Sequence, residues 1–344
     1  MENSINHQVI IIGAGPAGLA LGLYLQKNNV DYLILEQHSS AGSTWDQMPD
    51  HLSLISLWHS NCLTKEDLSL SSRVKAHSAK EFAEYLKGFA KKHMLKIKTN
   101  TKVLDIKKTN NLFAITTDNE QYTSEILVDC RGYFNYPFTP TIPISGNAPK
   151  MLHFKDYKNC AQFENDKKIL IVGKRLSAGQ LLREFAATGK HELYLSVRSE
   201  VKFSSHPLIY NFFLRNLNIF EGIIKGLKIN TKAEIEVPMH YDAKKVVEQE
   251  TTVKGDIVKI ENKNVYFTDG SVESVDVIIF ATGFKPHAVN FKNDFESIET
   301  SGLFYLGRNA QRTFTSRFIR GIREDAPILG QLILGRLASI TKDQ

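Results

Sequence analysis

The most constraining feature of the sequence is a glycine pattern close to its first residue. Four apolar residues, Val9 to Ile12, lead directly into Gly13-Ala14-Gly15-Pro16-Ala17-Gly18. Such an apolar, β-branched run is typical of a strand buried in a parallel sheet. A helical pattern of leucines follows, and a second apolar run, Tyr32 to Leu35, ends at Glu36. Strand, glycine turn, helix, strand and acid in this order predict a βαβ unit that binds a dinucleotide.

Each glycine of this pattern has its own physical role. Gly13 permits the tight turn from strand to helix, Gly15 lets a pyrophosphate approach the backbone, and Gly18 lets the helix pack closely on the strand. The phosphates would then lie at a helix N-terminus, which favours anions. Glu36 stands 18 residues after Gly18, close to the roughly 20 expected for an acid that binds ribose hydroxyls.

A second βαβ unit begins about 160 residues later. Its first strand and glycine are Ile169 to Gly173, its helix runs from about Ser177 to Ala187, and its second strand is Leu193 to Val197. Two such starts predict an α/β chain of two nested Rossmann-like dinucleotide-binding domains. We expect the linker at Tyr136 to Pro149. The other expected elements are a helix at Ala79 to His93, strands at Val103 to Ile106, Phe113 to Thr117, Ile126 to Val128, Val265 to Phe267 and Val277 to Phe280, and a last helix near Asp325 to Leu337.

Composition argues against several other classes of protein. The net charge of +6 comes from scattered residues, which suits anionic small ligands better than a nucleic acid. Cys62, Cys130 and Cys160 form no C-x-x-C pair, and no H-x-x-x-H occurs. This disfavours disulfides, a redox dithiol and a metal site. No apolar run approaches the roughly 18 residues of a membrane span, and the polar start has no signal peptide, so we expect a cytoplasmic protein.

Several further motifs make the chain resemble the flavin-containing monooxygenase superfamily, which includes plant YUCCA-type enzymes and bacterial CzcO-like flavoproteins. The glycine pattern and Glu36 both match that superfamily. The remaining motifs that carry the resemblance are Gly42-Ser43-Thr44-Trp45, His153-Phe154-Lys155-Asp156-Tyr157, Phe280-Ala281-Thr282-Gly283-Phe284 and Gly302-Leu303-Phe304-Tyr305-Leu306-Gly307. Each is common alone, and their order and spacing make the match specific.

This resemblance implies both an architecture and a chemistry. Residues 1–155 and 278–344 would form a discontinuous FAD domain, and residues 156–277 an inserted NAD(P)H-binding domain. In the family, NADPH reduces the flavin, O2 then reacts with it, and a small-molecule substrate is oxygenated. Because the hard chemistry belongs to the cofactor, no catalytic triad of side chains is expected.

The resemblance also nominates individual residues. Asn61 would lie beside the flavin, and His153 stands where the family has a histidine, although a purely structural histidine is the alternative there. The residues that would bind FAD are Gly13, Gly15, Pro16, Ala17, Gly18, Glu36, Gln37, Thr44, Trp45, Val103, Gly132 and Asp325. The residues that would bind NADPH are Gly173, Lys174, Arg175, Ser177, Arg198, Thr282 and Gly283.

Three positions depart from the family pattern. Arg175 stands where a glycine lets the backbone approach the coenzyme pyrophosphate, so its guanidinium either contacts the phosphates or fills the site. Asn147-Ala148-Pro149 replaces the F-x-G that precedes the family histidine. Cys130-Arg131-Gly132 replaces the first Ala-Thr-Gly. Arg198, by contrast, follows the second strand of the inserted unit, where an arginine accommodates the 2′-phosphate of NADP.

Three functions follow from the sequence. The leading one is an NADPH-dependent, FAD-containing monooxygenase acting on a small molecule. The second is an FAD reductase or oxidase without oxygenation, and the third is a non-catalytic FAD-binding accessory protein. The aromatic residues Phe203, Tyr210, Phe212, Phe213 and Phe220 suggest an apolar patch or lid, or core packing. The sequence names neither the substrate nor the oligomeric state.

Overall fold

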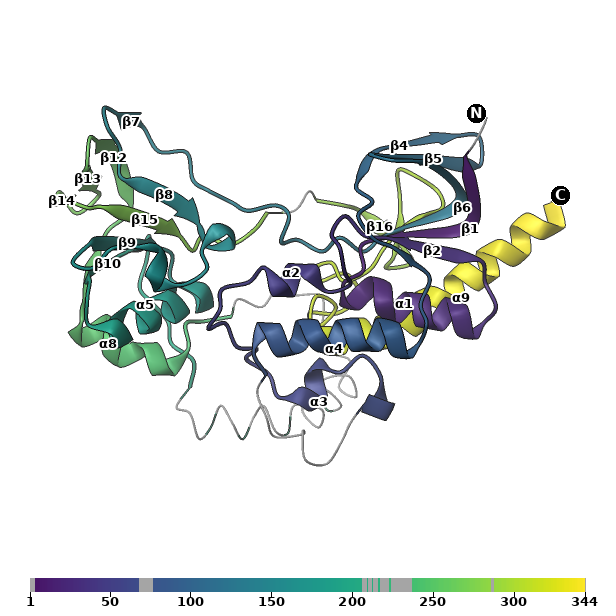
Figure 1. Ribbon diagram of the computed structural model, residues 1–344, viewed down its shortest axis with the longest axis horizontal. Helices are drawn as coiled ribbons and strands as arrows, with labels where there is room; N and C mark the ends of the chain where they lie inside the picture. The colour runs from purple at the N-terminus through teal and green to yellow at the C-terminus, as the bar shows by residue number, and fades with distance from the viewer. Residues whose placement is uncertain are drawn as a thin grey trace.

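The chain folds into two lobes, each built around a parallel sheet, and two segments cross between them (Figure 1). The computed structural model describes residues 4–67, 77–205, 237–285 and 288–343, with four single positions in between. Tyr210, Phe213 and Phe220 lie outside the described residues. Phe203 is partly buried against the core of the second lobe, and Phe212 is exposed.

The first lobe contains a nine-stranded sheet. Its parallel part has the order β3-β2-β1-β6-β18, and antiparallel strands extend it, β5 and β4 from β6 and β17 and β16 from β18. The strands are β1 (Ile5–Ile12), β2 (Tyr32–Leu35), β3 (Ile97–Lys98), β4 (Val103–Thr109), β5 (Leu112–Thr117), β6 (Gln121–Asp129), β16 (Phe291–Lys292), β17 (Glu296–Ser297) and β18 (Leu303–Tyr305).

Helices cover one face of this sheet. Residues of α1, α4 and α9 share one buried cluster with one face of β1, and residues of β4 and β5 share another cluster with its other face. A Cβ on Gly330 of α9 would lie 2.2 Å from the ring of Tyr24 in α1, so a glycine is needed where these helices touch. The helices of this lobe are α1 (Pro16–Lys27), α2 (Ser43–Asp46), α3 (Trp58–Asn61), η1 (Lys65–Asp67), α4 (Ala79–Lys92) and α9 (Ile319–Asp343).

The second lobe contains a five-stranded parallel sheet of order β11-β10-β9-β15-β8 and a small four-stranded sheet of order β14-β13-β12-β7. The strands are β7 (Ile144–Ser145), β8 (Lys150–His153), β9 (Lys168–Val172), β10 (Glu192–Ser196), β11 (Thr251–Lys254), β12 (Ile257–Glu261), β13 (Asn264–Phe267), β14 (Val272–Ser274) and β15 (Val277–Phe280). The helices are η2 (Phe154–Asp156), η3 (Cys160–Gln162), α5 (Leu176–Thr188), η4 (Tyr241–Ala243) and α8 (Lys244–Gln249).

The two parallel sheets repeat one another at the turn from strand to helix. The N–H of Gly13 donates to the carbonyl of Leu35 at 2.8 Å, and the N–H of Gly173 donates to the carbonyl of Ser196 at 3.1 Å. Both glycines have a positive φ. Residues 13–18 therefore correspond to residues 173–178, which confirms the predicted α/β class with two Rossmann-like units.

The strands on the other side of each turn repeat as well. The N–H of Cys130 donates to the carbonyl of Ile12 at 2.9 Å, and the N–H of Ala281 donates to the carbonyl of Val172 at 2.8 Å. Residues 130–132, which follow β6, therefore correspond to residues 281–283, which follow β15. Arg131 thus occupies the place that Thr282 occupies in the second unit.

The strand pairing differs from the predicted division at two edges. β8 and β15 both pair within the second sheet, whereas the sequence assigned residues 150–155 and 278–280 to the first domain. A fully buried parallel strand such as Val277–Phe280 carries no pattern that tells which sheet it joins. We propose that the domains meet in the crossing segments, residues 131–149 and 281–290, and the nested division itself stays a proposal.

Candidate functional site

A pocket lies where β1, β6 and β18 end at the same edge of the first sheet, and we call it the β1–β6 pocket. Its cavity volume is about 90 Å³. Ligands of open parallel sheets bind at such carboxyl ends, where the strand order reverses. The lining residues are Gly15, Pro16, Ala17, Glu36, Gly42, Ser43, Thr44, Trp45, Cys130, Arg131, Gly132, Tyr133, Phe134, Leu306, Gly307, Arg317, Ile319 and Ile322.

Two glycines of the turn beside the pocket, Gly15 and Gly18, have different structural roles. A Cβ on Gly18 would lie 2.0 Å from the carbonyl oxygen of Gly13, so Gly18 is required for α1 to pack against the turn. A Cβ on Gly15 would meet no protein atom within 4 Å. Gly15 therefore leaves open space inside the pocket, at the N-terminus of α1, where an anionic ligand is favoured.

The carboxylate of Glu36 is fixed at the end of β2. It accepts the N–H of Ala14 at 2.8 Å and the N–H of His38 at 2.9 Å, one on each oxygen. The side chain is buried and still lines the pocket. Because each carboxylate oxygen accepts more than one hydrogen bond, Glu36 retains acceptor capacity for hydroxyl groups of a ligand.

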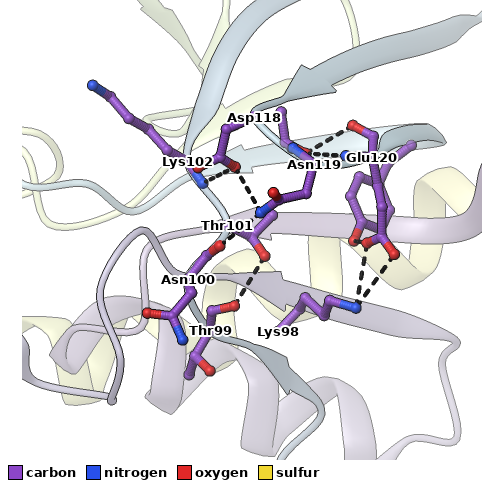
Figure 2. Close-up of polar contacts among 10 residues, drawn as sticks. Lys98, Thr99, Asn100, Thr101, Lys102, Asp118, Asn119 and Glu120 are labelled. Carbon is purple, nitrogen blue, oxygen red and sulfur yellow. Dashed lines mark hydrogen bonds and ion pairs between the residues drawn. The ribbon is translucent and has the colours of Figure 1, made fainter.

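The loop after β3 holds the corner at Glu36, and Figure 2 shows the polar contacts between this loop and the turn from β5 to β6. Two backbone hydrogen bonds join the loop 99–102 to the segment after β2. The N–H of Thr101 donates to the carbonyl of Glu36 at 2.8 Å, and the N–H of Asn100 donates to the carbonyl of His38 at 2.9 Å. The turn between β5 and β6 braces that loop in its turn. Asp118 accepts the N–H of Lys102 at 3.0 Å, and Asn119 donates to the carbonyl of Asn100 at 3.0 Å.

The segment after β2 forms a second wall of the pocket. Gly42 has a left-handed backbone, and its N–H donates to the carbonyl of Ala14 at 3.0 Å. This bond sets α2 against the glycine turn. Thr44 and Trp45 of α2 line the pocket, and the Trp45 ring packs edge-on against Phe82 of α4 with 4.8 Å between the ring centroids.

A buried charge cluster lies at the end of β6. Arg131 donates to Asp129 through Nε at 3.1 Å and Nη2 at 2.8 Å, and Nη2 of Arg308 lies 3.2 Å from the same carboxylate. Burial favours a raised pKa for Asp129, but the two arginines hold its pKa below the ordinary value. Nε and Nη1 of Arg308 are buried and have no hydrogen-bond partner among the described residues.

The structure sorts the predicted FAD residues into two groups. Gly15, Pro16, Ala17, Glu36, Thr44, Trp45 and Gly132 line the pocket, and Gly13 and Gly18 shape its turn. Gln37 is exposed beside Glu36. Val103 packs on the core between β1 and β4. Asp325 is fully buried in α9, where it accepts a hydrogen bond from Arg312 at 2.6 Å.

Asn61 does not line the pocket. Its side-chain amide donates to the carbonyl of Ser56 at 2.8 Å and accepts the Ser56 hydroxyl at 2.7 Å. Asn61 is buried, so this local pairing accounts for both ends of its amide.

His153 is bonded through both ring nitrogens. Nδ1 accepts the N–H of Lys155 at 3.1 Å, so Nε2 carries the proton and donates to the carbonyl of Gly283 at 3.0 Å. Burial lowers the pKa of His153 more than its bond to Gly283 raises it, which keeps the ring neutral. Its position ties β8 to one of the two crossing segments, as expected of a structural histidine.

The predicted coenzyme residues gather at the matching edge of the second sheet. Gly173 has a φ of 142°. Arg175 stands at the N-terminus of α5 with an extended backbone, like Gly15 in the first unit, and forms a β-bridge with Pro238. Lys174 donates to the hydroxyl of Ser199 at 2.5 Å, and Arg198 is exposed after β10. Ser177 lies in the first turn of α5.

Thr282 and Gly283 lie at the crossing between the lobes. The hydroxyl of Thr282 donates to the carbonyl of Phe138. The carbonyl of Gly283 accepts the N–H of Phe138 at 2.9 Å, and Lys285 N–H donates to the carbonyl of Tyr136 at 2.8 Å. The two crossing segments therefore lie side by side as a short antiparallel ribbon.

A second contact joins the lobes away from this ribbon, and we call it the latch. His51, which follows α2 in the chain, pairs through Nδ1 with Glu184 of α5 at 2.7 Å. Glu184 also accepts the hydroxyl of Tyr157 at 2.7 Å and the N–H of Cys160 at 2.9 Å. Beside this pair, Leu52 packs on the core of the second lobe.

The sequence reasoning missed several pocket residues. Gly307 and Leu306 belong to a motif that the sequence analysis quoted without assigning them a role. Tyr133, Phe134, Arg317 and Ile319 lie in segments without a recognisable pattern, and tertiary contacts, the pairing of β18 with β6 and the packing of α9 on α1, bring them together. Cys130 also lines the pocket, but its thiol is buried, which raises its pKa well above the ordinary value.

Within the described parts of the chain, no group of three or more His, Cys, Asp or Glu residues is arranged to hold a metal ion. In the same parts, none of the helices combines the length and the apolar character that crossing a bilayer requires.

Comparisons with known proteins agree with this geometry. Residues 10–318 match the model of the family described as pyridine nucleotide-disulphide oxidoreductase. The chain is 28% identical to an uncharacterized CzcO-like oxidoreductase of Geobacillus kaustophilus, over 93% of this chain and 96% of that protein. It is 25% identical to YUCCA10 of Arabidopsis thaliana, a probable indole-3-pyruvate monooxygenase, over 84% and 85% of the two chains.

The fold is shared with a solved flavin-containing monooxygenase of Stenotrophomonas maltophilia. The TM-score is 0.80 at 17% identity, over 97% of this chain and 99% of that one. Together with the family match and the curated relatives, this confirms the predicted resemblance to flavin-containing monooxygenases, and the family match confirms the expectation of an enzyme. The chain is an oxidoreductase that belongs to the pyridine nucleotide-disulphide oxidoreductase family.

Proposed function

We propose that the enzyme is an FAD-containing, NADPH-dependent monooxygenase of a small-molecule substrate. The observation that carries this proposal is the β1–β6 pocket, which has open space at Gly15 and the carboxylate of Glu36 fixed by backbone hydrogen bonds. A dinucleotide requires both features, one for its pyrophosphate and one for its ribose hydroxyls. When bound, FAD supplies the electron transfer and the reaction with oxygen.

The residues around the pocket suit the role of a flavin holder. Gly15 and the N-terminus of α1 would take the phosphates, and Glu36 would accept hydroxyl protons. Trp45, Tyr133 and Phe134 give the pocket aromatic walls, and such walls exclude water from a reactive cofactor. None of these roles requires a side chain that reacts.

The family name also suggests disulfide reduction, and the cysteines argue against it. A reactive cysteine has a lowered pKa and access to solvent. Cys130 is the cysteine that lines the pocket, and burial raises the pKa of its thiol. Cys62 and Cys160 also have raised pKa values, and in both burial is the leading cause. An oxygenation reaction, which uses no protein thiol, fits this chain better.

A second candidate is an FAD oxidase or reductase without oxygenation. Arg175 favours it, because this residue occupies the position that Gly15 occupies in the first unit. At Gly15 a side chain would extend into the ligand space. Arg175 therefore either binds the phosphates of NADPH or takes their place.

One experiment separates these candidates. The purified protein should be yellow, with about one FAD per chain, and anaerobic NADPH should bleach the flavin. Oxygen uptake should then depend on NADPH, and a substrate should gain one oxygen atom in a mass spectrum. A flavin that stays oxidised under excess NADPH, yet is bleached by a small-molecule donor, would establish the oxidase instead. Arg175→Gly should slow reduction if the arginine binds NADPH and speed it if the arginine blocks the site.

A further inference from the structure

The strongest unexplained feature of the molecule is the surplus of positive charge beside the β1–β6 pocket. Asp129 carries one negative charge between the guanidinium groups of Arg131 and Arg308. The exposed fractions of the Asp129, Arg308 and Arg131 side chains are 5%, 10% and 33%. One positive charge in this buried cluster is therefore not balanced by Asp129. Because Arg131 lines the pocket and is only partly exposed, an anion in the pocket would offset this charge.

The backbone puts Arg131 next to the glycine turn. A Cβ built on Gly13 would lie 3.4 Å from the Cα of Arg131. The bond from Cys130 N–H to the carbonyl of Ile12 sets this register across the two strands. The backbone of Arg131 therefore lies beside Gly13, and Arg131 and Gly15 line the same pocket.

Hydrogen bonds to Asp129 fix the position of the Arg131 side chain. Nε and Nη2 bind Asp129, and the backbone N–H of Arg131 donates to the same carboxylate at 3.0 Å. These bonds occupy one edge of the guanidinium, and Nη1 belongs to the other edge. Arg131 also lines the pocket. A planar guanidinium fixed in this way is well suited to phosphate oxygens.

The second unit supplies an internal comparison. Thr282 occupies the equivalent position there, and its hydroxyl is used within the protein, on the carbonyl of Phe138. The first unit thus has a cation where the second has a small neutral residue. Asp129 does not by itself account for that cation, because Arg308 already lies within 3.2 Å of the same carboxylate.

We propose that Arg131 is a phosphate-binding residue, whose guanidinium, anchored by Asp129, pairs with the pyrophosphate of the dinucleotide held at Gly13 to Gly15. This inference rests on the proposed FAD site. In this arrangement the pyrophosphate lies between the N-terminus of α1 on one side and Arg131 on the other. The phosphate charge also balances the surplus charge of the cluster.

The test measures binding of FAD and of ADP, which has the pyrophosphate without the flavin, to the full chain freed of cofactor. Arg131→Gln removes the charge and keeps a donor for Asp129. It should weaken both ligands by the same factor, roughly 10- to 100-fold, as the loss of one charge-assisted hydrogen bond does. The dependence of affinity on salt should become shallower in the variant. Lys107→Gln, which removes an exposed charge on β4, should leave both affinities unchanged.

Each other outcome decides a different question. Unchanged ADP binding in Arg131→Gln overturns the inference, and a loss confined to FAD would assign Arg131 to the flavin half instead. If Arg131→Gln does not fold, Arg131→Lys replaces it and should weaken both ligands by a smaller common factor. Unchanged ADP affinity in Arg131→Lys, with an unchanged dependence on salt, then overturns the inference. A wild-type chain that binds neither FAD nor ADP would refute the proposed function itself.

Discussion

At the scale of single residues, two glycines of one motif are needed for different physical reasons. Gly18 is fixed by the protein, because a Cβ there would strike the carbonyl of Gly13, whereas Gly15 faces only open space. The same sequence pattern therefore contains one structural residue and one residue reserved for a ligand. Sequence alone names both but does not measure the difference between them.

Substitution should separate the two glycines. We expect Gly15→Val to lose most of its FAD, since the branched side chain fills the space of the pyrophosphate, and to unfold at the same temperature as wild type freed of cofactor. Gly18→Ala should lower the unfolding midpoint strongly or yield insoluble protein, because its Cβ lies 2.0 Å from an oxygen atom. Flavin absorbance per chain and calorimetry measure the two effects. Full FAD content in Gly15→Val would show that the pyrophosphate lies elsewhere.

Residues close to a motif were predictable, and residues brought in by tertiary contacts were not. Glu36 was found because it ends a strand at a fixed distance from the glycines. Asp325 was assigned by resemblance and lies in the interior of α9, bonded to Arg312, because a helix of this length turns most of its positions away from any one pocket. Asn61 was also assigned by resemblance, and its side chain binds Ser56 instead. The spacing of residues in the sequence did not indicate which way a side chain of the short helix α3 points.

At the scale of secondary structure, the parallel strands were the most predictable elements. The run Tyr32 to Leu35 was placed at the residues that the structure gives it, because buried parallel strands are continuous apolar runs. The strands β7, β12 and β14 were not predicted. They belong to a small sheet in which β12 and β14 alternate in exposure and β7 has two exposed residues, and such short stretches are weak signals.

The helix α5 and the strand β10 should together decide coenzyme choice. Arg198 follows β10 and is exposed, two residues beyond Ser196, which accepts the N–H of Gly173. We expect Arg198→Ala to raise the apparent Michaelis constant for NADPH by roughly 10- to 100-fold, which is the effect of one lost charge-assisted contact. The constant for NADH should hardly change, because NADH lacks the extra phosphate. Steady-state flavin reduction measures both, and equal losses for the two coenzymes would contradict this role.

At the scale of the whole molecule, the latch links the two lobes through α5 and the segment that follows α2. His51 and Tyr157 both bind Glu184, whose side chain is 12% exposed. The latch is continuous in the chain with Thr44 and Trp45, which line the β1–β6 pocket. A short stretch of backbone therefore connects the latch to one wall of that pocket.

We expect Glu184→Gln to lower the free energy of unfolding by about 1–3 kcal/mol, as a buried group left with weakened partners does. Burial raises the pKa of Glu184, but the contacts with His51, Tyr157 and Cys160 lower it by more. The net pKa of Glu184 is therefore below the usual 4.5. A carboxyl whose folded pKa is lowered stabilises above its unfolded pKa and loses that effect as the pH falls through the folded pKa. The difference from wild type should therefore be full above about pH 4.5 and should shrink below it.

Denaturant unfolding at several pH values measures this difference. Lys80→Met breaks the exposed pair of Lys80 with Asp50 at the same junction and serves as the control, for which we expect little change. A Glu184→Gln variant as stable as Lys80→Met near neutral pH would show that the latch does not hold the lobes together.

The pairing of β18 with β6 has a consequence for how the chain folds. Leu303 pairs with Leu127, about 175 residues away along the chain. During synthesis β6 remains an open sheet edge until β18 has been made, and such edges invite wrong pairing. The cost of closing so long a loop falls once the second lobe has formed, because the ribbon then holds Phe138 beside Gly283. Folding of the second lobe therefore favours completion of the first sheet, and we expect a slow-folding variant of the second lobe to leave β6 exposed for longer.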